Sequence, residues 1–346
     1  MGPRIQQFEE EYARFLGCAH TLATSSCTAS LHLAYLAVGI GPGDEVVVPS
    51  MSFAATANAV VYCGGTPVFA DIVGAHDLGL DPAEVEARIT DRTKAVCTMH
   101  YGGYASAVDE LRELCDARGI ALIEDAAHAP SADYRGRKLG TWGELGCFSF
   151  FSNKVLSVGE GGLVATDSDE LAARVKSMRS HGMTSGTWDR HRGHAETYDI
   201  VELGFNYRMD EPRAALLLSR MRRVEDEILK RRRIVRDYRE RLSGVSGVTV
   251  PYADEDVDRS SCYVMPIVVD DGVDRRAVRQ SLNARGIQTS ILYPPIHEFA
   301  YYRALLPGVS LPRVESVARR QVTLPLFPHM TDEQVERVCT AVAEAV

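Results

Sequence analysis

The chain has 346 residues and a formal net charge of −9, with 38 Lys and Arg against 47 Asp and Glu. Hydrophobic residues make up 45% and charged residues 25%, a balance that is typical of globular proteins and excludes a largely disordered chain. The acidic balance argues against broad binding to nucleic acid or to anionic membranes, because both need a basic surface. The length exceeds the usual size of a single hydrophobic core, so we expect one large domain and a smaller one.

The eight cysteines are scattered and form no CxxC pair. Several stand in apolar runs such as KAVCTMHY, which is typical of reduced, buried thiols rather than of disulfides or a zinc site. No segment approaches the roughly 20 apolar residues that span a bilayer, and the first residues do not read as a secretory signal. We therefore expect a soluble, cytoplasmic protein that does not contact membranes.

Short apolar runs alternate with helical patterns in the first half of the chain. Strands are predicted at 45–50, 66–71, 94–100, 120–125 and 147–151. Helices are predicted at 29–39, 55–64 and 107–119. Such alternation predicts an α/β fold in which helices flank a mainly parallel sheet.

A different pattern follows in the second half. A helix is predicted at 169–182, and a long charged helix begins near Glu211 and runs to about Leu242. Strands are predicted at 261–270 and 287–293, and helices at 275–286 and 331–346. We therefore predict a large domain over residues 1–240 and a smaller α+β domain over residues 241–346.

Ligands of α/β sheets bind beyond the carboxyl ends of the strands, which directs attention to four segments. In TSSCTASLHLA, Ser26, Cys27 and Thr28 precede a helix whose free N–H groups could bind a phosphate, although simple N-capping explains them equally well. In IALIEDAAHAP, Asp125 ends an apolar strand and His128 follows. This carboxylate could pair with the protonated ring nitrogen of a cofactor, or it could cap a helix.

The third segment, CFSFFSNKVLSVGEGG, holds Lys154 between an apolar strand and a Gly-rich turn. Because burying an ammonium group is costly, a lysine enclosed there would have a lowered pKa and could form a Schiff base. A loop lysine that faces water is the alternative. The fourth segment, LGFNYRMDEPRAALL, places Asn206 before the long helix, either to contact a ligand or in a capping loop with Asp210.

Two further patterns resemble sites but lack the required spacing. GIGPGD at 39–44 follows a helix and precedes a strand, so it predicts a tight turn and not a dinucleotide site. His181, His191 and His194 with Asp189 lack the regular spacing of metal ligands, and we expect no metal centre.

The order of these segments is more specific than any one of them. TSSCTASLHLA, PSMSFAATANAV, EDAAHAPSA, SFFSNKVLSVGEGG and GFNYRMDEPRAAL follow one another as they do in the DegT/DnrJ family of sugar aminotransferases, which this chain strongly resembles. The likeness extends through YPPIH at 293–297 and TLPLFPHMT at 323–331. It implies the fold of the type I transferases that use pyridoxal 5′-phosphate (PLP). Two features depart from the family pattern: the sequence opens at MGPRIQQFEEE, and Cys27 stands where Gly is common.

The resemblance implies a role for each matching residue. Lys154 matches the lysine that binds PLP covalently and later moves a proton. Asp125 matches the carboxylate that keeps the pyridine nitrogen protonated. Phe53 matches the aromatic residue that stacks on the cofactor ring, and His128 matches a residue that packs near the ring and its 3′-oxygen.

The resemblance also implies how the phosphate is held. The matching phosphate-binding positions are Ser26, Cys27, Thr28 and Ser149. Asn206 matches a residue that reaches the phosphate of the neighbouring subunit, which implies a homodimer with shared active sites.

The implied reaction is a ping-pong transfer of an amino group from L-glutamate to a keto-sugar, most often a nucleotide-linked one. We expect the segment 187–198 to help bind the acceptor; a surface loop without ligand contact is the alternative. The residues expected to contact the acceptor are Trp188, Arg190, Arg192 and His297.

Other activities fit parts of the pattern. A keto-cyclitol acceptor and an aromatising PLP enzyme remain open, whereas the family's sugar dehydratases replace the lysine with His, and Lys154 is intact here. A PLP-binding regulatory protein would have little reason to retain both Lys154 and Asp125. A nicotinamide-dependent dehydrogenase would need a strand–GxGxxG–helix unit, which the sequence lacks.

Overall fold

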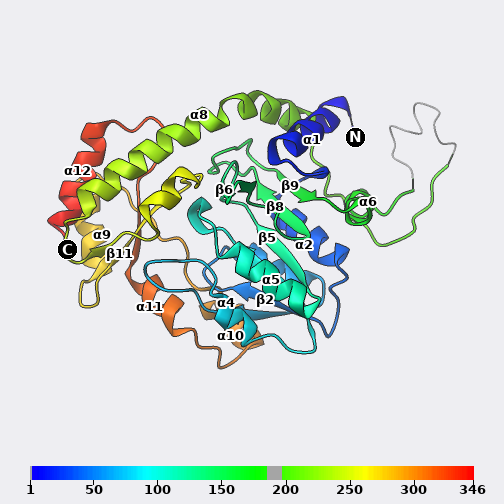
Figure 1. Ribbon diagram of the computed structural model, residues 1–346, viewed down its shortest axis with the longest axis horizontal. Helices are drawn as coiled ribbons and strands as arrows, with labels where there is room; N and C mark the ends of the chain where they lie inside the picture. The colour runs from blue at the N-terminus through cyan, green and yellow to red at the C-terminus, as the bar shows by residue number, and fades with distance from the viewer. Residues whose placement is uncertain (1, 185–196) are drawn as a thin grey trace.

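The computed structural model describes residues 2–184 and 197–346. Figure 1 labels the main elements along the chain. The strands are β1 His20–Thr24, β2 Glu45–Pro49, β3 Thr66–Ala70, β4 Thr93–Met99, β5 Ala121–Asp125, β6 Asp133–Tyr134, β7 Arg137–Lys138, β8 Leu145–Ser149, β9 Gly162–Thr166, β10 Val248–Thr249, β11 Met265–Val269 and β12 Gln321–Leu324. The helices are α1 Pro3–Leu16, α2 Cys27–Ala37, α3 Ala55–Tyr62, α4 Pro82–Glu86, α5 Val108–Arg118, α6 Asp169–Met178, α8 Glu211–Leu242, α9 Arg275–Ala284, α10 Ala300–Leu305, α11 Pro312–Arg320 and α12 Asp332–Ala343.

The large sheet has seven strands in the order β1-β9-β8-β5-β4-β2-β3. Strand β9 is antiparallel to β1 and to β8, and every other neighbouring pair is parallel. The carboxyl ends of β1, β8, β5, β4, β2 and β3 therefore lie at one edge of the sheet. The predicted α/β class and the five predicted strands of the first half are confirmed. Strands β1 and β9 were not predicted, because HTLAT and GLVAT lack a long apolar run.

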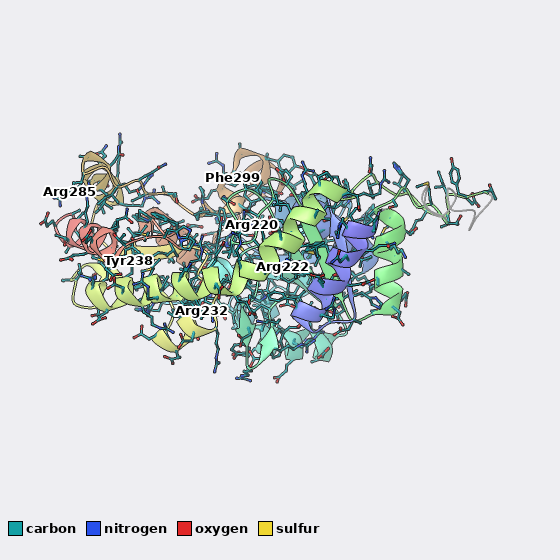
Figure 2. All side chains as sticks on the ribbon, turned by 90° about the horizontal axis from the view of Figure 1, so that it is seen from above. Arg220, Arg222, Arg232, Tyr238, Arg285 and Phe299 are labelled. Carbon is teal, nitrogen blue, oxygen red and sulfur yellow. The ribbon has the colours of Figure 1, made fainter. Side chains whose placement is uncertain are left out.

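The predicted long helix is α8, whose first turn is capped by Asp210: its side chain accepts a hydrogen bond from the N–H of Arg213 at 2.9 Å. In Figure 1 this helix extends from the neighbourhood of α1 to that of α12. Its first half packs into the core of the large sheet through residues such as Leu217, and its second half packs into a second core through Val235 and Tyr238. Figure 2 follows the helix from Arg220 and Arg222 to Tyr238, whose hydroxyl donates to the carbonyl of Pro325.

The second core lies against a three-stranded antiparallel sheet in the order β10-β11-β12, with α9 and α12. The predicted strand at 287–293 is wrong, since this segment forms only an isolated bridge between Ser290 and Thr323. Its backbone turns away from the sheet: the N–H of Leu292 donates to the side-chain oxygen of Gln321 at 3.2 Å instead of continuing a ladder. The segment thereby leads towards the large domain.

We propose that the chain divides into two domains near residue 240, as predicted, but that part of the C-terminal region packs with the large domain. Part of the C-terminal region packs on the core of the large sheet, through side chains that include Ile296, Tyr302 and Val314. Figure 1 accordingly places α10 beside α4 and β2, away from α9 and α12, and places α11 between α10 and β11. Across residues 2–184 and 197–346, no helix is both long enough and apolar enough to cross a membrane.

Candidate active site

A cavity of about 300 Å³ opens at the carboxyl edge of the large sheet. Most of its lining comes from the last residues of β4, β5 and β8 and from the segments that follow β1, β2, β5 and β8, as expected for a parallel sheet. The predicted residues that line it are Ser26, Cys27, Thr28, Phe53, Asp125, His128, Ser149 and Lys154. A larger cavity of about 540 Å³ on the small domain adjoins it at Asn153 and Leu292, but it holds neither Lys154 nor Asp125.

Lys154 lies in a turn directly after β8. The turn is closed on itself, because the N–H of Ser152 donates to the carbonyl of Gly159 and the N–H of Lys154 donates to the carbonyl of Phe151. The ammonium nitrogen lies 4.6 Å from the centroid of the Tyr263 ring. Burial lowers the pKa of Lys154 to about 8, while the carboxylate of Asp125 opposes this shift. About a tenth of the amine is therefore neutral, and nucleophilic, at pH 7.

Asp125 is the last residue of β5 and is 3% exposed. One carboxylate oxygen accepts a hydrogen bond from the Thr56 hydroxyl at 2.8 Å, and the other accepts one from the N–H of Ala127 at 3.1 Å. Burial raises its pKa, and these two donors and the charge of Lys154 work against that rise. The two hydrogen bonds fix the plane of the carboxylate, which can then face one protonated ring nitrogen.

The N-terminus of α2 forms another part of the wall. Ser26 caps this helix, since its hydroxyl accepts a hydrogen bond from the N–H of Ala29 at 3.1 Å. The first N–H groups of a helix lack partners within the helix, so those of Cys27 and Thr28 suit a bound phosphate. Strand β9 lies close by, because a Cβ on Gly162 would stand 2.4 Å from the carbonyl of Ser26. Both predicted roles of this segment, capping and phosphate binding, are thus compatible.

His128 and Phe53 lie on the same cavity wall with different exposure. His128 is fully buried, and its ring nitrogen Nε2 lies 2.9 Å from the hydroxyl of Tyr293. Burial holds the pKa of His128 well below its ordinary value, and the charge of Lys154 lowers it further. Phe53 is 59% exposed, with its ring centroid 6.1 Å from that of Tyr293, so its face is free to stack on a flat ligand.

Some of the predicted site residues lie elsewhere. Asn206 is exposed, pairs with Ser180 in an isolated bridge and does not line this cavity. His297 is 5% exposed, also lies outside the cavity and is hydrogen-bonded to Ser50 and Glu315. The remaining acceptor-binding predictions, Trp188, Arg190 and Arg192, lie outside the described residues, as do His191, His194 and Asp189.

The sequence did not predict several residues that line the cavity or contact the residues lining it. Thr56 fixes Asp125, Tyr263 lies against the Lys154 ammonium, and Tyr293 bonds His128. Asn153 and Glu160 also line the wall. Thr56 and Tyr293 stand within motifs that carry the family resemblance, PSMSFAAT and YPPIH, and this was the available signal. Tyr263 has no comparable signal, because it lies outside every motif that carries the resemblance.

The chemistry of this wall fits PLP. A buried carboxylate suits a pyridinium nitrogen, an amine of lowered pKa suits a cofactor aldehyde, and a helix N-terminus suits a phosphate. All three lie around one cavity with a flat aromatic side chain, Phe53, at its side.

Comparisons with known proteins agree with this reading. A model of the DegT/DnrJ/EryC1/StrS aminotransferase family matches residues 1–343. The spore coat polysaccharide biosynthesis protein SpsC of Bacillus subtilis is 37% identical, over 100% of this chain and 90% of that protein.

Two solved structures are similar over nearly the whole chain. DesI, in the presence of its TDP-sugar product, has a TM-score of 0.88 and 34% identity, and the match covers 99% of this chain and 85% of that one. NtdA from Bacillus subtilis, with bound cofactor PMP, has a TM-score of 0.89 and 29% identity, and the match covers 100% of this chain and 77% of that one. The chain therefore belongs to the DegT/DnrJ/EryC1/StrS aminotransferase family and is a PLP-dependent aminotransferase with the fold of the family's sugar aminotransferases.

Proposed function

We propose that this aminotransferase moves an amino group from L-glutamate to the keto group of a sugar linked to a nucleotide, in two half-reactions of a ping-pong cycle. The observation that supports amino transfer most directly is the meeting of Lys154, with its pKa of about 8, and the buried Asp125 at one cavity. The sugar acceptor is supported by the likeness to DesI, which was solved with a TDP-sugar product, and to SpsC, a polysaccharide biosynthesis protein.

PLP, when bound, supplies an electron-withdrawing ring that lowers the cost of removing a proton from the substrate carbon. The neutral amine of Lys154 takes this proton as a base, and the ammonium group so formed returns it as an acid. Asp125 keeps a proton on the ring nitrogen, and Thr56 holds Asp125 in place. Ser26, Cys27, Thr28 and Ser149 bind the phosphate, and Phe53 and His128 flank the ring.

We further propose a homodimer with shared sites. Asn206 is exposed, and the preceding segment exposes apolar side chains: Ile200 is 59%, Val201 64% and Leu203 82% exposed. A row of exposed apolar residues is costly in water unless another surface covers it. A second copy of the chain that covers this segment would bring Asn206 to the phosphate of the neighbouring site.

The first test is the absorption spectrum of the purified protein reconstituted with PLP, before and after L-glutamate is added without an acceptor. The proposal expects a visible band that disappears as one 2-oxoglutarate is released per site. A visible band that survives L-glutamate but disappears with another amino donor would show that L-glutamate is not the donor. A protein that binds no PLP would contradict the site assignments.

The second test concerns the acceptor. After the first half-reaction, TDP- and UDP-linked keto-sugars and a keto-inositol are added separately, and recovery of the visible band is followed. The proposal expects recovery with a nucleotide-linked sugar, and recovery only with the keto-inositol would contradict it. If Arg190 and Arg192 bind the acceptor, their replacement by alanine should raise its KM and leave the L-glutamate half-reaction unchanged.

A third test uses mixed dimers of Lys154→Ala and Asn206→Ala subunits. If each site combines Lys154 of one subunit with Asn206 of the other, mixing two inactive variants restores one intact site per mixed dimer. Random exchange then returns about a quarter of the wild-type activity, because half of the dimers are mixed and each has one intact site of two. No gain over the separate variants, despite proven exchange, would contradict shared sites.

A further inference from the structure

Tyr293 lies in the cavity wall beside Lys154 and Asp125, although it comes from the second half of the chain. The preceding residue, Leu292, is held on both sides of its Cα: its carbonyl accepts a hydrogen bond from the Tyr101 hydroxyl, and its N–H donates to the side-chain oxygen of Gln321. Gln321 in turn donates to Tyr101 at 3.3 Å. The tyrosine ring is therefore positioned by a closed set of hydrogen bonds and not by an unsupported loop.

His128 is the one residue that hydrogen-bonds the Tyr293 hydroxyl within residues 2–184 and 197–346. The direction of that bond follows from the other ring nitrogen, Nδ1, which accepts a hydrogen bond from the N–H of Gly102 at 3.3 Å. Gly102 has a φ of 68°, a left-handed conformation that glycine adopts readily.

A neutral imidazole carries a single proton, and Nδ1 cannot carry it while it accepts a hydrogen bond. Burial and the nearby Lys154 charge hold the pKa of His128 well below its ordinary value, so the ring is neutral. The proton is therefore on Nε2, and Nε2–H donates to the oxygen of Tyr293 across 2.9 Å. The hydrogen of the Tyr293 hydroxyl is then directed away from His128.

We propose that Tyr293 is a catalytic residue whose hydroxyl, oriented by the chain Gly102–His128–Tyr293, donates a hydrogen bond to an oxygen held in the cavity beside Lys154. Two oxygens have the required chemistry: the phenolic oxygen of the cofactor and the carbonyl oxygen of a substrate. Each carries negative charge during the reaction, and a preoriented donor in a buried site stabilises such charge. Burial also raises the pKa of Tyr293 well above its usual value, which keeps the donor protonated.

This inference rests on PLP-dependent amino transfer and not on the identity of the donor or the acceptor. Its test compares holoenzyme with Tyr293→Phe holoenzyme, a change that retains the ring and removes the hydroxyl. If the phenolic oxygen is the partner, the pKa of the visible band rises, because that oxygen holds its shared proton more tightly without the donor. If the substrate oxygen is the partner, the band is unchanged and the single-turnover rate falls about 10²-fold.

The matched control is Tyr238→Phe, which removes a buried tyrosine hydroxyl from the second core. This control should lower the unfolding temperature without changing the spectrum or the rate. A Tyr293→Phe enzyme whose band pKa and single-turnover rate both match those of the control would overturn the proposal. The band pKa and the single-turnover rate with the amino donor are both measured without an acceptor, so failure of the proposed acceptor would leave them interpretable.

The orienting role of His128 is tested by a double-mutant cycle with His128→Asn and Tyr293→Phe. If His128 acts by directing the tyrosine hydrogen, the loss in rate of the double variant is smaller than the product of the two single losses. If the loss in rate of the double variant equals the product of the two single losses, His128 does not act through Tyr293.

Discussion

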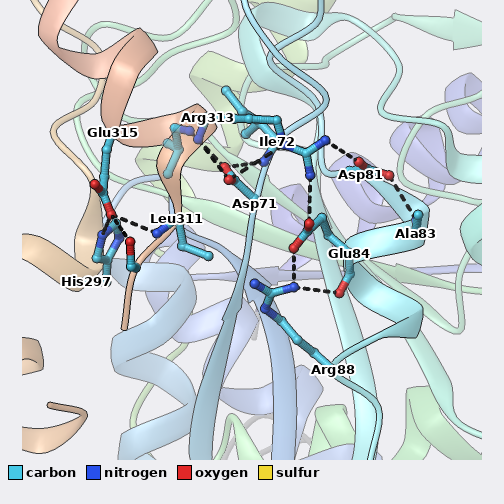
Figure 3. A network of polar contacts seen from close by, with 12 residues as sticks. Asp71, Ile72, Asp81, Ala83, Glu84, Arg88, His297, Leu311, Arg313 and Glu315 are labelled. Carbon is cyan, nitrogen blue, oxygen red and sulfur yellow. Dashed lines mark hydrogen bonds and ion pairs between the residues drawn. The ribbon is translucent and has the colours of Figure 1, made fainter. Parts of the chain in front are cut away.

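The molecule contains two groups of charged side chains, each built around a buried carboxylate, with different surroundings. In the first, shown in Figure 3, protein atoms satisfy the charges: Asp71 accepts hydrogen bonds from the N–H groups of Arg313 and Val314 at 3.0 and 2.8 Å. The Arg313 guanidinium bridges from there to Asp81 at 2.8 Å and to Glu84 at 3.0 Å. This group joins α11 to the loop and helix that follow β3.

In the second group, around the cavity, the charges are left partly open to a ligand. Lys154 makes no ion pair closer than 4 Å within the described part of the chain, and its ammonium faces the ring of Tyr263. Asp125 receives two donors but retains carboxylate lone pairs that face the cavity. Burial alone therefore does not identify a functional charge. A buried charge whose partners are all protein atoms holds the fold, and one that faces an open cavity is available for chemistry.

The largest effect is expected at Lys154. Replacing Lys154 by alanine removes both the covalent anchor and the proton-transferring group, so kcat should fall by at least about 10⁴-fold while the fold persists. Activity and the visible band of the reconstituted protein are the measurements. The control is Lys176→Ala on the exposed face of α6, which should retain both. A Lys154→Ala enzyme with wild-type turnover would contradict the assignment of chemistry to the charges that face the cavity.

A second prediction uses two adjacent carboxylates of β5 that point to opposite faces of the strand. Glu124 is fully buried, accepts hydrogen bonds from the N–H groups of Gly140 and Gly143, and pairs with His100 at 2.8 Å. Glu124→Gln should therefore lower the free energy of unfolding by about 1–3 kcal/mol and leave kcat nearly unchanged.

Asp125→Asn should show the opposite balance. Its loss of charge opposite the ring nitrogen should lower kcat by about 10²–10³-fold, with a smaller effect on unfolding. Urea unfolding and kcat measured on both variants test this pair. If the loss of kcat and the loss of unfolding free energy stand in the same ratio in both variants, the two carboxylates do not differ in role.

A third prediction concerns pH. Burial lowers the pKa of Lys154 to about 8, and only the neutral amine attacks the cofactor aldehyde. The rate at which the apoprotein recovers its visible band with PLP should therefore rise with pH and reach half of its maximum near pH 8. A lysine in water would require a pH above 10. A rate that is constant between pH 6.5 and 9 would contradict the lowered pKa.

The sequence could predict the residues at the strand ends because their placement depends on local order. Asp125 and Ser149 end apolar strands, Ser26 precedes a helix, and in a parallel sheet such ends meet at one edge. Which of these residues hold PLP came from the resemblance and not from spacing.

The rest of the site depends on contacts between distant segments. Tyr293 reaches the cavity and Tyr263 reaches the Lys154 ammonium only because segments after α8 fold back against the end of the large sheet, and no periodicity in the chain encodes that approach. The same limit explains why residues 287–293 looked like a strand. Their apolar side chains pack in the cavity wall and in the cores instead of forming part of a β-ladder.

Replacing His297 should have the smallest effect on catalysis. It also tests the difference between the two groups most sharply, because His297 was predicted to bind the acceptor. The structure places it near the first group, bonded to protein atoms only: Nδ1 lies 2.7 Å from the Ser50 hydroxyl and Nε2 lies 3.3 Å from Glu315. His297→Ala should lower the free energy of unfolding by about 1–3 kcal/mol, since both polar partners lose a hydrogen bond. The acceptor KM should stay within about twofold, because the ring does not line the cavity.

Glu298→Ala, at the exposed neighbouring position, is the matched control and should change neither quantity. A tenfold rise in acceptor KM in His297→Ala, with the L-glutamate half-reaction intact, would restore His297 as a substrate residue. It would also show that a side chain whose ring nitrogens both bond to the protein still shapes the acceptor site. Unchanged KM together with lower stability would instead assign His297, like Arg313, to the joint between the C-terminal region and the large domain.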